Sequence, residues 1–308
     1  MKLSFVVPCY NEAENVAAFQ AAVIKAFDGC GYDYEIVFVD DGSNDATFHE
    51  LRKLHSNEFC PVKVISFSRN FGKEAALFAG LKHVTGDYVS LIDADLQQNP
   101  AIVRQMVDIL ENHEEYDVVA AYQDRRNEGK VLSFFKKSFY SIINKLSDIT
   151  MKSDASDFRT FRRSVAESIV CMGECHRFSK GIFAWIGYNT YFIPYIAQPR
   201  VAGKSKWSFW KLLNYAIEGI IGYSTKPLRI ATFLGGFTAF AALIYLVIVV
   251  LQKLIIGIDI LGYATIIVLI LLLGGMQLFC IGIIGEYVGR TFEQSKDRPI
   301  YIAKEILE

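Results

Sequence analysis

Short apolar runs alternate with longer amphipathic stretches over the first 122 residues of the chain. Five of these runs have the length and β-branched content of strands, at residues 3–7, 35–39, 62–66, 88–92 and 118–121. They are apolar almost without interruption, which is typical of strands buried on both faces of a sheet. The stretches between them have the length of helices, so the pattern predicts an α/β fold, a mostly parallel sheet with helices on both faces.

Two far longer apolar segments follow, at about residues 230–251 and 260–285. Neither contains Asp, Glu, Lys or Arg, and 52% of the whole chain is hydrophobic, a high share for a water-soluble protein. Each segment exceeds the roughly 20 residues that a helix needs to cross a bilayer. Buried core helices are usually shorter and carry a polar stripe, so we predict two transmembrane helices.

Basic residues flank this predicted hairpin on its outer sides. Lys226 and Arg229 precede the first segment, Arg290, Lys296, Arg298 and Lys304 follow the second, and the connector holds Lys253. Positive charge favours the cytoplasmic side of a membrane, and the first residues lack the pattern of a signal peptide. We therefore expect a protein of the cell membrane with two spans, its catalytic domain and both termini in the cytoplasm.

Two amphipathic segments precede the spans. In residues 130–146 the apolar side chains share one helical face, which could lie on lipid headgroups or dock against the sheet. Residues 207–221 are apolar around most of a helix, and their narrow polar stripe could face the active site or solvent. The expected parts are a cytosolic catalytic domain (1–206), an interfacial amphipathic helix (207–227), the two spans (228–286) and a cytosolic C-terminal tail (287–308).

The formal net charge of −1 provides no field that would attract nucleic acid, so no nucleic-acid partner is expected. Six cysteines are scattered along the chain. Cys171 and Cys175 have helical spacing beside His176, but no second pair follows in the sequence, which favours free cytosolic thiols over a zinc site. In the spans, the paired glycines at 235–236 and 274–275 would allow close helix contacts in a homo-oligomer.

Polar residues follow three of the predicted strands directly. They are Pro8-Cys9-Tyr10-Asn11-Glu12, Asp40-Asp41-Gly42-Ser43 and Asp93-Ala94-Asp95-Leu96-Gln97. In an open α/β sheet, the carboxyl ends of the strands line the crevice that binds ligands. Tyr10 offers a ring for stacking on a nucleobase, and base or ribose could bind Asn11 or Glu12, and Asp40 or Asp41. Each turn alone would be an ordinary helix start, whereas three in succession indicate a nucleotide site.

The third turn has the ligands of a metal site. Asp93 and Asp95, one residue apart and followed by Gln97, supply the hard oxygen atoms that Mg²⁺ or Mn²⁺ prefers. Such an ion would also bind the diphosphate of a nucleotide. An isolated Asp-x-Asp is more often a solvated turn at a strand end, but the two other polar turns favour the metal interpretation.

These motifs resemble those of glycosyltransferase family 2, and specifically of its polyprenyl-phosphate branch, which includes bactoprenol glucosyltransferases and dolichol-phosphate mannosyltransferases. The resemblance rests on Pro-x-Tyr-Asn-Glu, Asp-Asp-Gly-Ser and Asp-Ala-Asp-Leu-Gln, and it extends over nearly the whole chain. Similar segments are Asp157-Phe158-Arg159, Arg177-Phe178 with Gly181, Arg200-x-x-Gly203-x-Ser205-Lys206 and Gly285-Glu286-Tyr287.

The resemblance implies a GT-A nucleotide-sugar-binding domain, a divalent cation, Mg²⁺ or Mn²⁺, and inverting transfer of a single sugar to polyprenyl (undecaprenyl) phosphate at the cytosolic membrane face. The product would serve the modification of cell-envelope glycans. The two-span end is more similar to the bactoprenol branch, which favours UDP-glucose or UDP-N-acetylglucosamine as nucleotide-sugar donor. The Gln-x-x-Arg-Trp motif of processive synthases does not occur. A different lipid acceptor and an inactive membrane scaffold of the same fold are the alternatives.

The resemblance also assigns roles to residues. Nucleotide-sugar binding falls to Pro8, Tyr10, Glu12, Val39, Asp41, Lys73, Asp93 and Ala94, joined by Asn11 and Asp40 from the turns above, and the metal to Asp93, Asp95 and Gln97. Asp157 is the expected catalytic carboxylate, as base or as orienting group, together with Asp95, and Asp154 is its nearby competitor.

Cations are expected between the two phosphate-bearing substrates, because their charges repel each other. Arg177, Arg200 and Lys206 are the candidates, with Arg126 or Arg125 added because Gln123 stands where many relatives have an arginine. Attraction to lipid headgroups is the competing interpretation for Arg200 and Lys206.

Overall fold

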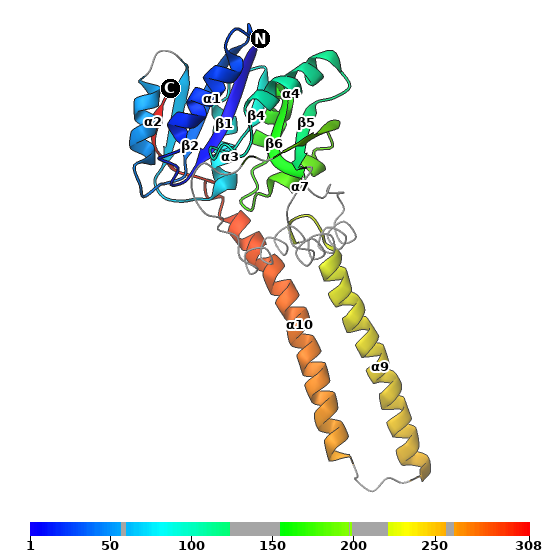
Figure 1. Ribbon diagram of the computed structural model, residues 1–308. Coiled ribbons are helices and arrows are strands. Elements are labelled where there is room, and N and C mark those ends of the chain that lie inside the picture. The colour runs from blue at the N-terminus through cyan, green and yellow to red at the C-terminus, as the bar shows by residue number, and fades with distance from the viewer. Residues whose placement is uncertain (57–59, 124–154, 197, 199–220, 257–261) are drawn as a thin grey trace.

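The computed structural model describes residues 1–56, 60–123, 155–196, 198, 221–256 and 262–308. Its strands are β1 (Lys2–Cys9), β2 (Asp33–Asp40), β3 (Val62–Phe67), β4 (Tyr88–Leu91), β5 (Val118–Gln123), β6 (Ala155–Arg162), β7 (Thr190–Tyr195) and β8 (Ala303–Leu307). Its helices are α1 (Val16–Phe27), α2 (Thr47–His55), α3 (Lys73–His83), α4 (Ala101–Asn112), α6 (Arg163–Val170), α7 (Ser179–Trp185), α9 (Lys226–Ile256) and α10 (Tyr263–Ser295). The strands and shorter helices form one layered domain, from which α9 and α10 project (Figure 1).

The eight strands form a single sheet in the order β7-β5-β6-β4-β1-β2-β3-β8. β1 pairs in parallel with both β2 and β4, and β2 pairs in parallel with β3, so these four strands end at the same edge. β6 lies antiparallel between β4 and β5, and β8 is antiparallel to β3. The predicted fold class and the five predicted strands are confirmed, and β6, β7 and β8 are additional strands that the sequence pattern had not indicated.

Helices cover both faces of the sheet, as the apolar strands require. Successive residues of β1 point to opposite faces, so Phe5 packs in the core beneath α1, α2 and α4, whereas Val6 packs in the core beneath α3, α6 and α7. Helix α3 lies especially close to the sheet, because a Cβ atom at Gly80 would come within 2.4 Å of Val6 Cγ1. This close packing fixes the position of the first residue of α3, Lys73, at the strand ends.

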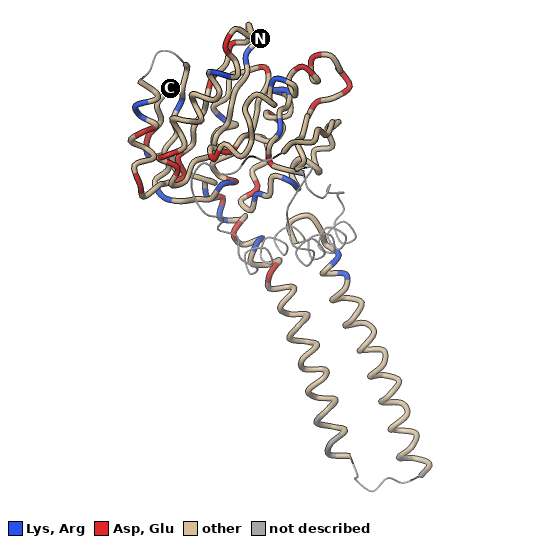
Figure 2. Tube along the Cα trace, in the orientation of Figure 1, with Lys and Arg blue, Asp and Glu red and all other residues tan. Residues whose placement is uncertain are grey.

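The two long helices have the composition of membrane spans. No Asp, Glu, Lys or Arg occurs from Ile230 to Gln252 in α9 or from Tyr263 to Gly285 in α10, and large apolar side chains along both helices are exposed. Both are long and apolar enough to cross a membrane. Charged residues of these helices occur only near their ends: Lys226 and Arg229 begin α9, Lys253 lies in its last turn, and those of α10 begin at Glu286. The start of α9 and the end of α10 lie next to the layered domain (Figure 2). The apolar hairpin predicted from the sequence is therefore present, and it supports an association with membranes.

The chain after the second apolar helix returns to the layered domain. Helix α10 continues to Ser295, the ring of Tyr301 stacks on Phe67 at a centroid distance of 4.9 Å, and β8 pairs with the edge strand β3. Residues 287–308, which the sequence suggested to be a tail, thus form the last turns of the span helix and one edge of the sheet. The predicted amphipathic helix at 130–146, and the one at 207–227 except for 221–227, lie outside the described residues.

The buried carboxylate of Glu35 in β2 links this strand to β1 and to the turn that follows α3. Glu35 is 1% exposed, accepts hydrogen bonds from Ser4 Oγ and the Thr85 backbone N–H, each at 2.6 Å, and lies 2.9 Å from Lys2 Nζ. Burial alone would raise the pKa of Glu35, but the hydrogen bonds from Ser4, Lys2 and Thr85 lower it to about 2.

Because the pKa of Glu35 is lower in the folded than in the unfolded chain, its stabilisation is complete above about pH 4.5 and is lost as the pH falls towards about 2. Glu35→Gln should lower the free energy of unfolding near neutral pH by about 2–3 kcal/mol and flatten the loss of stability between these pH values. Thermal unfolding of the full-length protein in detergent, followed by circular dichroism across this pH range, measures both. The exposed pair of Glu50 with Lys53 provides the control Glu50→Gln, and equal stability of wild type and Glu35→Gln would contradict the prediction.

Candidate active site

A cavity of about 810 Å³ opens at the carboxyl ends of β1, β2 and β4. Segments that are distant in the sequence line it: Pro8, Cys9, Tyr10 and Glu12 after β1, Asp41 after β2, residues 70–75, 93–95 and 175–178, Asp157 of β6, Gly222, Tyr223, Arg290 and Ile300. The position agrees with the expected ligand crevice of an α/β sheet. Arg290 belongs to the long apolar helix α10, so the membrane hairpin contributes to the cavity wall.

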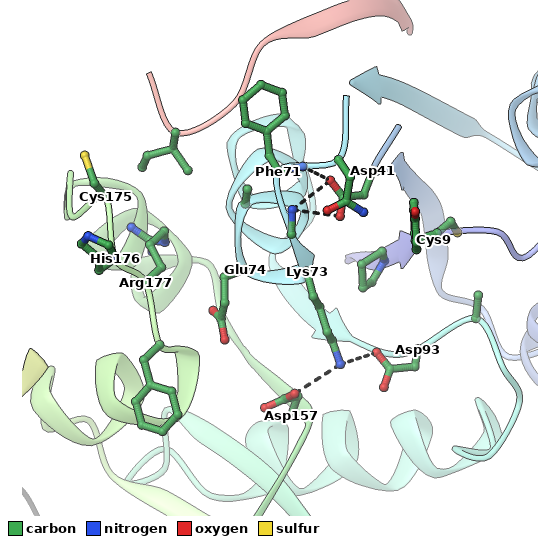
Figure 3. A pocket seen from close by; sticks show the side chains of 18 of the residues that line it. Cys9, Asp41, Phe71, Lys73, Glu74, Asp93, Asp157, Cys175, His176 and Arg177 are labelled. Carbon is green, nitrogen blue, oxygen red and sulfur yellow. Dashed lines mark hydrogen bonds and ion pairs between the residues drawn. The ribbon is translucent and has the colours of Figure 1, made fainter. Parts of the chain in front are cut away.

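Lys73 joins two carboxylates at the centre of this cavity (Figure 3). Its Nζ atom lies 2.7 Å from Asp93 Oδ1 and 3.2 Å from Asp157 Oδ2. Strand pairing explains how the carboxylates meet, because Leu91 of β4 pairs with Arg159 of the antiparallel strand β6. Two residues beyond Leu91, the end of β4, the chain reaches Asp93, and two residues before Arg159 in β6 lies Asp157. Lys73 reaches both carboxylates because it is the first residue of α3, which packs close to the sheet.

The three charges of this cluster stabilise one another. Burial alone would raise the pKa of Asp157, but Lys73, Lys180 and Arg159 hold it well below its usual range. Burial likewise opposes the charge of Lys73, and the carboxylates of Asp93 and Asp157 nevertheless keep its pKa above the usual value. Asp157 is therefore ionised at neutral pH and only weakly basic. A carboxylate of this kind is better suited to orienting a substrate than to abstracting a proton.

The Asp-Asp-Gly turn after β2 holds the loop that leads into α3. Asp41 accepts hydrogen bonds from the backbone N–H groups of Phe71 at 2.7 Å and Gly72 at 3.0 Å (Figure 3). Gly42 has a φ of 65°, and a Cβ atom there would lie 2.3 Å from the carbonyl carbon of Arg69. Only glycine permits this close approach. The motif thus orders the loop that presents Lys73, and Asp41 also lines the cavity.

Three residues predicted to bind the nucleotide lie outside the cavity lining. Asp40 is buried and accepts hydrogen bonds from Ser66 Oγ at 2.9 Å and the Ser43 backbone N–H at 3.1 Å. The side-chain oxygen of Asn11 accepts a hydrogen bond from the Asn44 backbone N–H at 2.9 Å, which ties the first turn to the second. Val39 is fully buried beneath α3. In this structure the side chains of Asp40 and Asn11 thus bind neighbouring segments of the protein, and Val39 is part of the hydrophobic core.

The other predicted residues, apart from Gln97, either line the cavity or lie outside the described part of the chain. Those that line the cavity are Pro8, Tyr10, Glu12, Asp41, Lys73, Asp93, Ala94, Asp95, Asp157 and Arg177. Arg177 donates hydrogen bonds to the carbonyl oxygens of Ile169 and Met172 at the end of α6, and its guanidinium lies 4.3 Å from the ring centre of Phe78. Its guanidinium therefore already has protein partners. Arg126, Arg200 and Lys206, and the competitors Asp154 and Arg125, lie outside the described residues.

Two of the three expected metal ligands face the cavity. Asp93 and Asp95 line it, whereas Gln97 does not: its backbone N–H donates a hydrogen bond to Asp95 Oδ1 at 3.1 Å, and its side-chain nitrogen lies 3.5 Å from the Gln198 carbonyl oxygen. No group of three or more His, Cys, Asp or Glu side chains that could hold a metal ion occurs in the described part of the chain.

A divalent cation fits this arrangement if a ligand completes its coordination. The ammonium group beside Asp93 shows that a positive charge is stabilised at this position. Two carboxylates leave most of the six positions around Mg²⁺ to water and to the oxygens of a bound diphosphate, which is the usual arrangement for this ion. Asp93 and Asp95 are therefore the residues that would hold it.

Sequence reasoning missed several residues of the cavity. Glu74 follows Lys73 on α3 and accepts hydrogen bonds from the backbone N–H and the hydroxyl of Ser179 at the start of α7. Burial and the nearby Asp157 raise the pKa of Glu74. Arg290 and Tyr223 come from segments next to the spans, where the sequence showed only basic charge and apolar residues. No local spacing links these residues to the polar turns, so the sequence carried no signal for them.

Comparisons with known sequences agree with this architecture. Residues 4–170 match the family "Glycosyl transferase family 2", and residues 226–291 match the family "GtrB C-terminal hairpin". A bactoprenol glucosyl transferase of Shigella phage SfV is 41% identical over 305 residues, 99% of this chain and 98% of that protein. A prophage bactoprenol glucosyl transferase homolog of Escherichia coli is 41% identical over 99% of both chains.

Among solved structures, glucosyl-3-phosphoglycerate synthase from Mycobacterium tuberculosis, in complex with Mn²⁺, uridine diphosphate and phosphoglyceric acid, superimposes with a TM-score of 0.51. Its sequence is 18% identical, and the match covers 71% of this chain and 76% of that one, which is a likeness of fold. The family match spans more than half of the residues, and relatives align along nearly the whole chain. The chain therefore belongs to glycosyl transferase family 2 and is a glycosyltransferase.

Proposed function

We propose that this glycosyltransferase transfers one hexose from a UDP-sugar to polyprenyl phosphate at the cytosolic face of the membrane, with the aid of Mg²⁺ or Mn²⁺. The observation that carries the proposal is a catalytic cavity with Asp93, Lys73 and Asp157 at its centre and Arg290 of the apolar hairpin in its wall. Such a cavity can receive a soluble donor from one side and a lipid from the other. The names of the relatives support glucose as the sugar and bactoprenol as the lipid.

The reaction requires one bond to form and one to break. An oxygen of the lipid phosphate attacks the anomeric carbon in line with the bond to UDP, which leaves, so that the anomeric configuration inverts. A phosphate monoester has a second pKa of about 6 and is mostly dianionic at neutral pH, so no strong base is needed. This agrees with the low pKa of Asp157, which we assign to orienting the sugar or the acceptor.

The cavity supplies positive charge where negative charge accumulates. Lys73 lies between Asp93 and Asp157, next to the position proposed for the donor diphosphate. When bound by Asp93 and Asp95, a divalent cation would neutralise the departing nucleoside diphosphate. Pro8, Tyr10, Glu12 and Asp41 surround the proposed nucleotide position.

The basic residues favour a cytoplasmic orientation for this domain. Lys226 and Arg229 lie at the start of α9, and Arg290 and Lys296 lie at or just beyond the end of α10. Both of these helix ends are next to the catalytic domain (Figure 2). Positive residues at both outer ends of a hairpin are retained in the cytoplasm. UDP-sugars would then reach the cavity directly from the cytosol.

A transfer assay tests the proposal. The full-length protein in nanodiscs is given radiolabelled UDP-glucose or UDP-N-acetylglucosamine with Mn²⁺ or Mg²⁺, and either undecaprenyl phosphate or diacylglycerol. Label in a phosphate-linked polyprenyl lipid is the expected result. Label in diacylglycerol alone would assign a different lipid acceptor, and no transfer to any lipid with either ion would favour an inactive scaffold.

Asp157→Asn should lower the turnover number about 100-fold or more, while the dissociation constant for UDP-glucose changes by less than about threefold. The reason is that Asp157 is assigned to the reacting groups rather than to the nucleotide. Single-turnover kinetics and calorimetric titration separate the two quantities. Asp108→Asn on the exposed side of α4 is the matched control, and unchanged turnover of Asp157→Asn would remove this carboxylate from the mechanism.

Lys73→Met should strengthen the binding of Mn²⁺ to the nucleotide-free protein about tenfold or more, because the ammonium 2.7 Å from Asp93 repels a second cation. Electron paramagnetic resonance of free Mn²⁺ during a titration measures this affinity. Lys82→Met removes a lysine of the same helix whose ammonium lies over the ring of Phe78, and it should have no effect. An unchanged or weaker affinity of Lys73→Met would contradict the assignment of the ion to Asp93 and Asp95.

A further inference from the structure

The second span carries a cation into the catalytic cavity. Arg290 lies on α10 five residues after the apolar stretch ends at Gly285, and its side chain is 17% exposed. It lines the cavity together with Gly222, whose Cβ position would be 3.9 Å from Arg290 Nη1. A guanidinium group thus lies where the membrane hairpin meets the site of sugar transfer.

One N–H donor of this guanidinium lacks a hydrogen-bond acceptor among the described residues. Arg290 Nε is buried and has no hydrogen-bond acceptor within the described part of the chain. Within the described residues, Glu286 Oε1 lies 3.5 Å from Nε, an ion pair that is not counted as a hydrogen bond. A buried donor without an acceptor is unfavourable. An anionic ligand in the cavity would supply the missing oxygen.

The end of α10 is held against the domain, which fixes the place of Arg290. Gln294 accepts a hydrogen bond from the Cys175 backbone N–H at 2.9 Å and donates one to the Gly173 carbonyl oxygen at 3.1 Å. The preceding residue, Glu293, contacts His176 Nε2 through its carboxylate. These contacts join α10 to the segment that forms another wall of the cavity.

A mostly apolar groove of about 330 Å³ lies between the start of α9 and α10, with Glu286 as the charged residue of its lining. Pro227, Phe279 and Ile283 are among the residues that line it, and Gly282 forms part of its wall. The hydroxyl of Tyr287, another lining residue, donates a hydrogen bond to the Ser224 carbonyl oxygen at 2.6 Å and so links α10 to the segment just before α9.

The groove and the cavity share consecutive parts of the chain. Ile221 lines the groove and Gly222 the cavity, and Tyr287 lines the groove one helical turn before Arg290 in the cavity. A molecule with an apolar chain in the groove would therefore place its head group beside Arg290. The chemistry of the combined site is that of a lipid with an anionic end.

We propose that the groove binds the first isoprene units of the polyprenyl acceptor and that Arg290 binds its terminal phosphate, an inference that rests on the proposed function. A terminal monoester presents several free oxygens to the fork of an arginine, whereas the diester of an ordinary phospholipid presents a single charge between two substituents. The positive charge of Arg290 and the neighbouring lining residues of groove and cavity thus favour a polyprenyl monophosphate as the occupant.

Arg290→Gln should raise the KM for undecaprenyl phosphate about tenfold or more and leave the dissociation constant for UDP-glucose within about twofold. Arg290→Lys, which keeps the charge without the fork, should lie between Arg290→Gln and wild type. Lys296→Gln removes an exposed cation of the chain just beyond α10, stacked over Phe292, and should match wild type. Steady-state transfer in nanodiscs and calorimetric titration of the donor supply both constants.

Gly282→Leu tests the groove itself, because a Cβ atom at Gly282 would meet no atom within 4 Å and the larger side chain would fill the groove without a clash at that atom. Its KM should rise both for undecaprenyl phosphate and for a short, water-soluble prenyl phosphate, because the first isoprene units of either acceptor would occupy the groove, whereas its dissociation constant for UDP-glucose should stay within about twofold of wild type. Gly285→Leu, on the same helix but outside the groove lining, should leave both constants unchanged.

The outcomes separate this inference from the proposed function. If wild type forms no glycolipid, the proposed function fails. If wild type is active and Arg290→Gln has an unchanged KM for the acceptor, or loses UDP-glucose binding to the same extent, the assignment of Arg290 is overturned. A wild-type KM of Gly282→Leu for either prenyl acceptor would overturn the assignment of the groove, and so would equal protection of the wild type against thermal unfolding by phosphatidic acid and undecaprenyl phosphate. Should Arg290→Gln fail to fold, Arg290→Lys decides by the same constants.

Discussion

The ammonium group of Lys73 between the carboxylates of Asp93 and Asp157 is the interaction around which the catalytic domain is arranged. Two carboxylates at this separation repel each other in a partly buried site, and the cation makes their proximity favourable. Three independent features of the fold bring the groups together. Gly80 lets α3 approach the sheet, the antiparallel pairing of β6 with β4 places Asp157 beside Asp93, and Asp41 orders the loop that precedes Lys73.

The second organising feature is the return of the chain from the membrane hairpin to the sheet. Contacts of α10 with residues 173–176, the stacking of Tyr301 on Phe67, and the pairing of β8 with β3 bind the end of the second span to the catalytic domain. Because these contacts are spread along residues 294–307, they hold the end of α10 in a defined position against the catalytic domain. The hairpin therefore acts as a wall of the active site as well as an anchor.

Polar motifs at strand ends served two purposes that the sequence could not separate. Asp41 and Asp40 are adjacent and both buried, but Asp41 lines the cavity, whereas Asp40 accepts hydrogen bonds from Ser43 and Ser66. Alternation along an extended chain sends neighbouring side chains to opposite sides, and the spacing of a motif does not reveal which side is open. In the same way, Asn11 binds a neighbouring turn and Gln97 orders Asp95, although both belong to motifs that also contain cavity residues.

The sequence by itself determined the α/β class, the first four parallel strands with β5, the carboxyl edge of the sheet as the site, and the two long apolar helices. These properties are local, because burial of a strand and the length of a span are written in consecutive residues. Only the tertiary structure decided that β6 and β8 join the sheet, that Lys73 bridges Asp93 and Asp157, and that Arg290 enters the cavity. Each of these depends on pairing register or helix packing between segments that are far apart in the chain. Short polar strands and edge strands also have too few apolar residues in a regular pattern to be predicted from the sequence.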